Sequence, residues 1–148
     1  MLKTILLCYD GSREGQAVLD DGAELALRFD ADTHLLAVIQ PSAAAVVAEA
    51  IAAESPITEI GRAAEEILKQ GIDKLTDKGL KVEGHIVEGQ AVEQIALMAR
   101  EIGADLVVLG HRHRGPLERW WQNSVGSTLL DESPCSILIA LGKDGKEA

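Results

Sequence analysis

The chain has 148 residues and a formal net charge of −10, and its composition is 47% hydrophobic but only 3% aromatic. This length is close to the commonest domain size, so we expect one domain with an aliphatic core. The acidic balance argues against general nucleic-acid binding, because an acidic surface repels a phosphate backbone. We also expect a cytoplasmic protein, since the sequence shows neither a signal-peptide pattern nor a hydrophobic run approaching the ~20 residues of a membrane span.

The first half of the chain predicts two buried strands with a helix between them. The hydrophobic runs Thr4–Tyr9 and Thr33–Ile39 are short, which is typical of strands. Ser12 is a suitable N-cap for the helix that follows the first strand. The stretch Gln40–Ser55, rich in alanine and flanked by prolines, predicts an excursion with a short helix. The first helix is expected to bury the residues at helical spacing, namely Val18, Gly22, Leu25, Ala26 and Phe29.

The second half of the chain predicts three helices and three strands. The segment Ile57–Lys78 has a clear helical stripe, and Gly79 ends it. The strand Lys81–Val87 is more polar than the others, which predicts a position at the edge of a sheet. The remaining predicted elements are the helix Gln90–Ile102 closed by Gly103, the strand Leu106–Leu109, a helix over Leu117–Glu132 ended by Pro134, and the strand Ser136–Leu141.

Strands and helices alternate along the whole chain. Such alternation requires crossover helices and therefore a parallel sheet with helices on both faces, the doubly wound α/β class. Proteins of this class bind ligands beyond the carboxyl ends of the strands, where the strand order reverses. The loops expected at that edge are Asp10–Ser12, the stretch from Val38 onward, Glu88–Gly89 and Gly110–Pro116.

The loop after the fourth predicted strand concentrates positive charge in an acidic protein. Residues 110–124 carry three arginines, among them Arg112 and Arg114, and one glutamate, a net of +2, so the other 133 residues carry −12. Gly110 lets backbone N–H groups approach an anion, and the N-terminus of the next predicted helix adds unpaired donors. The segment therefore indicates an anion site, with a solvated turn as the alternative interpretation.

Several segments, in their order and spacing, carry a family likeness. They are Ile5–Asp10 followed by Gly11–Ser12, Glu88–Ala91 before a helix, Ala104–Gly110, Asn123–Val125 and Ser133–Ile139. With these segments the chain resembles the universal stress protein A family over essentially its whole length. The resemblance implies a five-stranded sheet in the order 3-2-1-4-5, a universal stress protein domain over residues 1–142 and a solvated tail over 143–148. It also implies a homodimer joined along the last strand, through Ser136, Ile137, Leu138 and Ile139.

Nucleotide-binding members of that family carry the pattern G-x2-G-x9-G-[S/T] after the fourth strand. In this chain Gly110 matches the first glycine, His113 and Asn123 replace the second and third, and Ser124 keeps the hydroxyl. Asparagine tolerates left-handed backbone angles, whereas most side chains cost roughly 1–2 kcal/mol there. We therefore expect an altered phosphate site rather than the family's usual one.

The resemblance also implies the other contacts of a nucleotide. Asp10 would face adenine or ribose, and the backbone of Val38 would meet the adenine edge. The side chains of Arg112 and Arg114 are candidates to replace phosphate donors that the lost glycines would have exposed, since arginine binds phosphate with two N–H groups. Together with Gly110, His113, Asn123 and Ser124, these residues form the predicted site.

Two functions from different classes are compatible with these residues. The first is a regulatory stress protein that binds ATP, ADP or AMP, with magnesium only when the nucleotide is bound and with at most slow hydrolysis. The alternative is a dimeric stress-response protein that binds no nucleotide and acts through protein–protein contacts. An enzyme with appreciable turnover is disfavoured, because no base–nucleophile pair is visible.

The histidines outside this pattern favour simpler interpretations. His111 and His113 could hold a metal, but no acidic or cysteine partner lies nearby in sequence, so no metal site is predicted. His34 and His85 lie on predicted strands and are interpreted as structural. The two cysteines lie in hydrophobic runs without CxxC spacing, which indicates neither a disulfide framework nor a zinc site.

Overall fold

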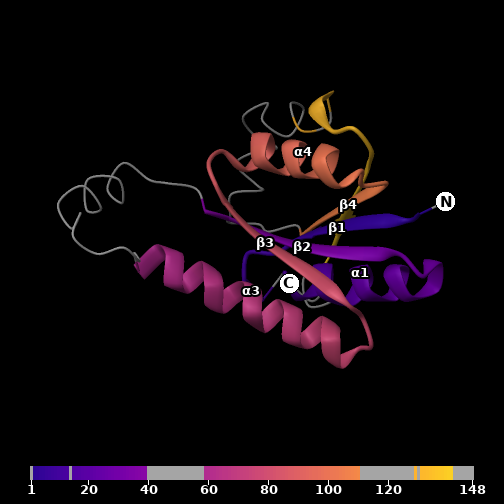
Figure 1. The fold of residues 1–148 in the computed structure, drawn as a ribbon, viewed down its shortest axis with the longest axis horizontal. Coiled ribbons are helices and arrows are strands. Elements are labelled where there is room, and N and C mark those ends of the chain that lie inside the picture. The colour runs from indigo at the N-terminus through magenta and orange to yellow at the C-terminus, as the bar shows by residue number, and fades with distance from the viewer. Residues whose placement is uncertain (1, 14, 40–58, 111–128, 130, 142–148) are drawn as a thin grey trace.

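The computed structural model describes residues 2–13, 15–39, 59–110, 129 and 131–141. The predicted excursion Gln40–Ser55 lies outside these residues, as does most of the helix predicted over Leu117–Glu132. The five strands form one parallel sheet in the order β3-β2-β1-β4-β5, which confirms the predicted fold class, the strand order and the edge position of β3 (Figure 1). None of the helices in the described ranges is long and apolar enough to cross a membrane. The elements in chain order are β1 (Thr4–Cys8), α1 (Gln16–Phe29), β2 (Asp32–Ile39), α3 (Glu59–Asp77), β3 (Val82–Glu88), α4 (Ala91–Ile102), β4 (Leu106–Gly110) and β5 (Ser136–Ala140).

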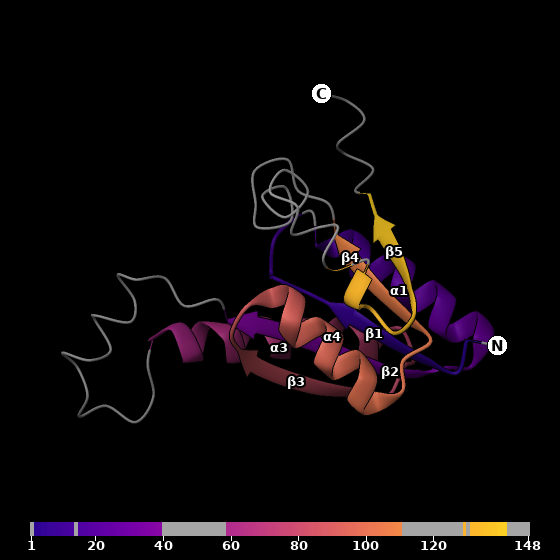
Figure 2. The same cartoon turned by 90° about the horizontal axis from the view of Figure 1, so that it is seen from above.

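Helices cover both faces of the sheet. Helices α1 and α3 pack on one face and α4 packs on the other, as Figures 1 and 2 together show. Side chains alternate along β1, so Ile5 and Leu7 join the core under α1 and α3, while Leu6 joins the core under α4. All three side chains are 0% exposed. This strand is therefore buried on both faces, as its continuous hydrophobic run predicts.

Two glycines let the helices lie close to the sheet. Gly22 of α1 lies against Leu7 of β1, and a Cβ on this glycine would be 2.4 Å from Leu7 Cδ2. Gly71 of α3 lies in the same way against Leu35 of β2, where an added Cβ would be 2.6 Å from Leu35 Cδ2. Close-packed interiors leave no room for another methyl group at such distances. An alanine at either position would therefore have to displace a buried leucine side chain.

The first helix begins later than the sequence predicts. Ser12 is not its N-cap, because that position belongs to Gly15 and α1 begins at Gln16. Ser12 Oγ instead accepts a hydrogen bond from the Gly15 N–H at 2.9 Å, inside a turn that precedes the helix. At the other end Phe29, predicted to be buried, is 46% exposed because the buried face of α1 ends one turn earlier.

One carboxylate joins the neighbouring strands β1 and β4 at the amino end of the sheet. Asp105 Oδ2 accepts hydrogen bonds from the backbone N–H groups of Lys3 at 2.9 Å and Thr4 at 3.0 Å. The N–H of Asp105 donates in turn to the carbonyl of Thr4 at 2.8 Å. The two bonds from backbone N–H groups lower the pKa of Asp105, because they favour its charged form. The start of β1 is thereby fixed against the start of β4.

Candidate functional site

The expected ligand edge lies at the carboxyl ends of β1 and β4, where the strand order reverses. From β1 the chain continues to β2 on one side, whereas β4 lies on the other side. The register pairs Cys8 of β1 with Leu36 of β2, and continuing it by two residues places Asp10 level with Val38. Gly110 is the last residue of β4, the other neighbour of β1. The structure therefore brings these three predicted site residues, Asp10, Val38 and Gly110, to one edge of the sheet.

A hydrogen-bonded turn carries Asp10 at the end of β1. Asp10 Oδ1 accepts hydrogen bonds from the N–H and the hydroxyl of Ser12, at 2.9 and 2.5 Å, and Ser12 Oγ accepts one from Gly15. Gly11 has φ +78°, and a Cβ at this position would lie 2.9 Å from Ile67 Cγ1 of α3. Both the backbone angle and the space require glycine here. The turn fixes one carboxylate oxygen of Asp10 while the residue itself stays exposed.

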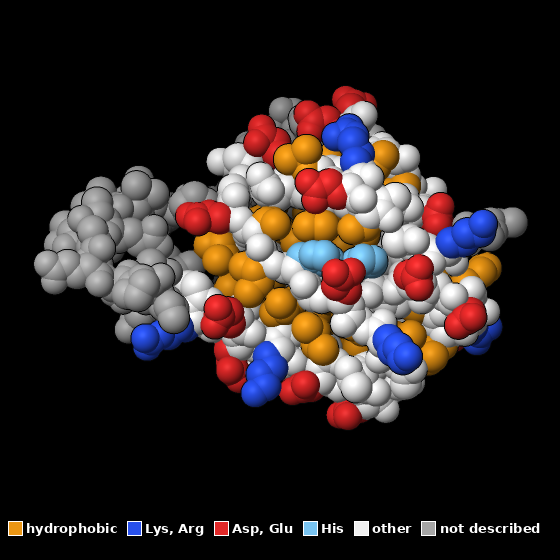
Figure 3. Space-filling view, in the orientation of Figure 1, with side chains coloured by type: hydrophobic (Ala, Val, Ile, Leu, Met, Phe, Trp, Pro, Cys, Tyr) orange, Lys and Arg blue, Asp and Glu red, His pale blue; other side chains and the backbone are white. Residues whose placement is uncertain are grey.

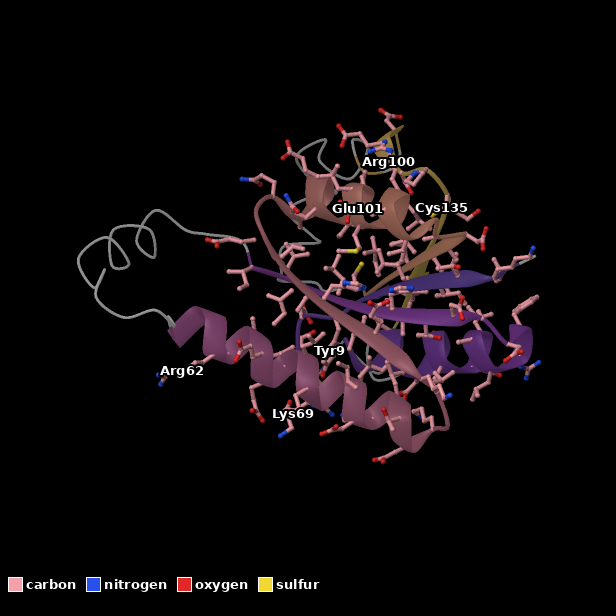
Figure 4. All side chains as sticks on the ribbon, in the orientation of Figure 1. Tyr9, Arg62, Lys69, Arg100, Glu101 and Cys135 are labelled. Carbon is pink, nitrogen blue, oxygen red and sulfur yellow. The ribbon has the colours of Figure 1, made fainter. Side chains whose placement is uncertain are left out.

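A chain of polar contacts lies beneath this turn. Tyr9 is only 4% exposed, and its hydroxyl accepts a hydrogen bond from Gln16 Nε2 at 2.6 Å. Lys74 Nζ of α3 donates to Gln16 Oε1, so the contacts join β1, α1 and α3 beside the labelled Tyr9 of Figure 4. Burial, the largest influence on this group, raises the pKa of Tyr9. Sequence reasoning missed this chain, because Gln16 and Lys74 are 58 residues apart and neither belongs to a motif.

The neighbouring strand ends are fixed through the backbone. The N–H of Gly89, which follows β3, donates to the carbonyl of Ile39 at the end of β2 at 2.9 Å. The side chain of Val38 packs against the core under α4. A contact between Val38 and a ligand at the edge would therefore use the backbone of this residue, as the family resemblance implies.

The positively charged segment expected at this edge lies outside the described residues from position 111 onward. On α3, Arg62 and Lys69 point away from the sheet (Figure 4). Arg13 is exposed in the turn that carries Asp10, three residues after it along the chain. The predicted site residues that lie outside the described part of the chain are Arg112, His113, Arg114, Asn123 and Ser124.

The two cysteines are poorly suited to nucleophilic chemistry. Cys8 and Cys135 are both free thiols. Burial raises the pKa of both groups above the ordinary value for cysteine. The thiolate is the reactive form, so each residue remains a protonated and weakly reactive thiol at neutral pH.

Comparison with known proteins decides the family. The model of the Universal stress protein family matches residues 1–140 of this chain. The chain belongs to the universal stress protein family. A universal stress protein of Synechocystis sp. is 29% identical over 141 residues, which cover 94% of this chain and 85% of that relative.

Solved structures of similar proteins share the fold. The structure of the hypothetical protein MJ0577 matches with a TM-score of 0.78 and 24% identity, covering 97% of this chain and 99% of the other. A universal stress protein family protein from Arabidopsis thaliana, solved with AMP bound, matches with a TM-score of 0.66 and 16% identity, covering 97% of this chain and 94% of the other. At these levels of identity the similarity shows that the folds are alike. The ligand of the present chain therefore has to be argued from its own residues.

Proposed function

We propose that the chain is a regulatory protein that binds an adenine nucleotide at the carboxyl ends of β1 and β4, with at most slow hydrolysis. The observation that supports this function most directly is the turn that holds Asp10 exposed at the point where the strand order reverses. Open parallel sheets place their ligands at this point. The Arabidopsis family member of the same fold carries AMP, which supports the choice of an adenine nucleotide.

Each residue at the edge has a separate role in this proposal. Asp10 accepts hydrogen bonds from the ribose hydroxyls or the adenine amino group, because a carboxylate is an acceptor only. The backbone of Val38 faces the adenine edge. Gly110 allows the phosphates to approach the backbone after β4, since glycine has no Cβ.

The phosphates are assigned to the loop that follows Gly110. Arg112, Arg114 and Ser124 supply donors to the phosphate oxygens, and two N–H groups of one guanidinium can bind two oxygens together. His113 and Asn123 occupy the positions of the family's second and third glycines. Magnesium accompanies the nucleotide and has no separate site in this proposal.

The direct test is a calorimetric titration of the protein with ATP, ADP and AMP, each with and without magnesium. Asp10→Ala removes a charged hydrogen-bond acceptor. A hydrogen bond to a charged group contributes roughly 1.5–3 kcal/mol to binding, so we expect about a ten- to hundredfold loss of affinity. Asp21→Ala is the matched control, because Asp21 is exposed on α1 away from the carboxyl ends of the strands. Equal affinity of the Asp10→Ala and Asp21→Ala variants would remove Asp10 from the site.

A second variant separates a contact of Asp10 from its part in the turn. Ser12→Ala deletes the hydroxyl that bonds both Asp10 and Gly15 but keeps the carboxylate. If Asp10 contacts the nucleotide, we expect Ser12→Ala to weaken binding less than Asp10→Ala does. A loss as large as that of Asp10→Ala would show that Asp10 acts by shaping the turn.

The loop is tested by restoring the family pattern. His113→Gly combined with Asn123→Gly should raise the affinity for ATP, if the missing glycines obstruct the phosphates. A fall in affinity would instead identify His113 as a ligand of the phosphate. If neither protein binds any of the three nucleotides at millimolar concentration, the nucleotide proposal is wrong.

The edge strand β5 supports a second candidate function, that of a dimer acting through protein contacts. Ile137, Leu138 and Ile139 are only half-buried in the chain, and Leu141 beyond them is 58% exposed. An apolar strand at the edge of a sheet is a template for pairing with another chain. The family resemblance implies a dimer along this strand, and we propose that two chains associate through it.

Sedimentation equilibrium tests the dimer independently of any nucleotide. The native protein should sediment at twice the chain mass of 15.8 kDa at micromolar concentration. Ile137→Lys places a charge in the proposed interface and should yield a monomer. Leu97→Lys is the matched control, since Leu97 is 48% exposed on α4, and it should leave the dimer intact. A native monomer, or a dimer that survives Ile137→Lys, would exclude β5 as the interface.

A further inference from the structure

Two histidines and a glutamate meet on one face of the sheet, over β2 and the edge strand β3. The register pairs His34 with Glu83 and Leu36 with His85. Alternate residues of a strand share a face, so all four side chains lie on the same side of the sheet. Leu36 belongs to the core under α4, which identifies this side as the α4 face.

The polar atoms of the three residues converge. His34 Nδ1 lies 2.9 Å from His85 Nε2 and 3.5 Å from Glu83 Oε2. The ligand atoms of all three residues lie within 4.8 Å of one another. The rings are nearly parallel, with 15° between their planes and 5.2 Å between their centroids. The hydrogen bond between the two histidines agrees with their interpretation as structural residues. That interpretation does not explain why Glu83 lies beside them, whereas a metal site would use all three residues as ligands.

The two separations that involve His34 are close to those between metal ligands. Zinc binds histidine nitrogen at 2.0–2.1 Å and carboxylate oxygen at 2.0–2.2 Å, so tetrahedral ligands stand about 3.3 Å apart. The observed separations of 2.9 and 3.5 Å lie on either side of that value. An ion bound here would take the place of the hydrogen bond between the two rings.

Solvent reaches this cluster from one side. The side chain of Glu83 is 70% exposed, whereas that of His34 is only 14% exposed. Figure 3 shows the histidines of the described residues side by side on the visible face, with hydrophobic side chains around them. An ion could therefore enter past Glu83 and be held against an apolar surround, which strengthens its attraction to the ligands.

We propose that His34, Glu83 and His85 bind one divalent transition-metal ion, zinc foremost, with a fourth position open to water. Two imidazoles and one carboxylate are a donor set that zinc accepts, whereas magnesium and calcium prefer oxygen ligands alone. The site lies in the first half of β2 and β3, away from the nucleotide edge beyond the carboxyl ends of the strands. It does not depend on the nucleotide proposal.

Metal binding changes the hydrogen bonding of the pair. In the metal-free protein one ring nitrogen must carry a proton and donate it to the other, since both lone pairs cannot face each other. For both nitrogens to bind the ion, the donating ring moves its proton to its other nitrogen, so its tautomer changes while the ring stays neutral. The ion then cross-links β2 to the edge strand β3.

The test is a calorimetric titration of metal-free protein with zinc ions alone, in a buffer that does not chelate zinc. The background is His111→Gln combined with His113→Gln, because that pair lies outside the described residues and could bind zinc by itself. We expect one ion per chain in the native protein and in this background. In the background, His34→Gln or His85→Gln should weaken binding by more than about tenfold, the smallest loss that outer-shell substitutions typically cause.

Glu83→Gln keeps the proposal testable if a histidine variant does not fold. Glu83 is exposed, so this variant should keep the native circular dichroism while its zinc affinity falls by more than about tenfold. Glu65→Gln, an exposed position on α3 across the sheet, is the matched control and should bind zinc like the native protein. Cobalt ions bound in place of zinc should show the strong visible absorption of four-coordinate cobalt without a thiolate band, which excludes the cysteines as ligands.

Three results would overturn the proposal. They are no zinc binding at micromolar concentration, an affinity unchanged by His34→Gln, His85→Gln or Glu83→Gln, and binding that disappears with the His111 and His113 substitutions alone.

Discussion

Strands β1 and β3 belong to the same parallel sheet but differ in how deeply their side chains are buried. In the centre of the sheet, Ile5, Leu6 and Leu7 of β1 are all 0% exposed, so both faces of the strand serve packing. At the edge, every residue of β3 is half-buried or exposed, and Glu83 and His85 lie beside His34 of the neighbouring strand β2. A central strand can therefore offer a polar side chain only beyond its end, as β1 does with its turn. An edge strand can offer polar side chains along its length.

The largest effect should come from truncating the central strand. Leu7→Ala removes a fully buried side chain from the core under α1 and α3, and we expect a loss of about 2–5 kcal/mol in the free energy of unfolding. Ile86→Ala, the corresponding truncation in β3, affects a side chain that is 36% exposed and should cost less, about 1–2 kcal/mol. Urea unfolding measures both values. Similar losses at the two positions would contradict the contrast between the strands.

A smaller loss should follow from adding a single methyl group against β1. Gly22→Ala places a Cβ 2.4 Å from Leu7 Cδ2, and overpacking of this kind costs about 1–3 kcal/mol although alanine favours helices. In the Leu7→Ala background the clashing atoms are gone, so the same substitution should be neutral or stabilising. A double-mutant cycle by urea unfolding measures this coupling. Additive losses would show that the close approach of α1 is not what requires glycine.

The smallest effect concerns the charge that joins β1 to β4. The pKa of Asp105 lies below the ordinary value of an aspartate because two backbone N–H groups bond the charged form. The charge therefore stabilises the fold above that value, and this contribution is lost as the pH falls through the lower pKa of the folded state. Asp105→Asn should have a lower thermal unfolding temperature than the native protein at pH 7, and the difference should shrink on acidification below about pH 4.

Asp73→Asn provides the control for this comparison, because Asp73 is exposed on α3. Its unfolding temperature should follow that of the native protein across the same pH range. A difference for Asp105→Asn that persists unchanged at low pH would mean that the charge contributes nothing and that the amide alone disturbs the contact.

The sequence predicted the fold well because its strongest signals are those of buried elements. The run Thr4–Tyr9 lacks the alternating polar residues of a strand with one face in solvent, which indicated a buried strand. The more polar run Lys81–Val87 indicated the edge position of β3. The start of α1 was predicted three residues too early. Ser12 has the side chain of an N-cap, but it bonds within a preceding turn, and sequence spacing alone cannot distinguish the two uses.

The candidate site was predictable only in part. Asp10 follows a buried strand directly, so its place at the ligand edge followed from the fold class. The contact of Tyr9 with Gln16 and Lys74 depends on how α1 and α3 lie against β1, which no local pattern encodes. The meeting of His34 with His85 depends in the same way on the pairing register of β2 with β3, because the two residues are 51 positions apart.

The pairing of β1 with β4 has a consequence for how the chain folds during synthesis. The bond from Thr4 to Asp105 spans 101 positions, whereas β2 and β3 follow β1 within the first 88 residues. A nascent chain can therefore assemble β1, β2 and β3 while β4 is still inside the ribosome. Until β4 emerges, the future centre of the sheet is an unpaired hydrophobic edge, which is the arrangement most prone to aggregation. The arrival of Leu106–Gly110 beside β1 is thus the step that covers this edge of the nascent sheet.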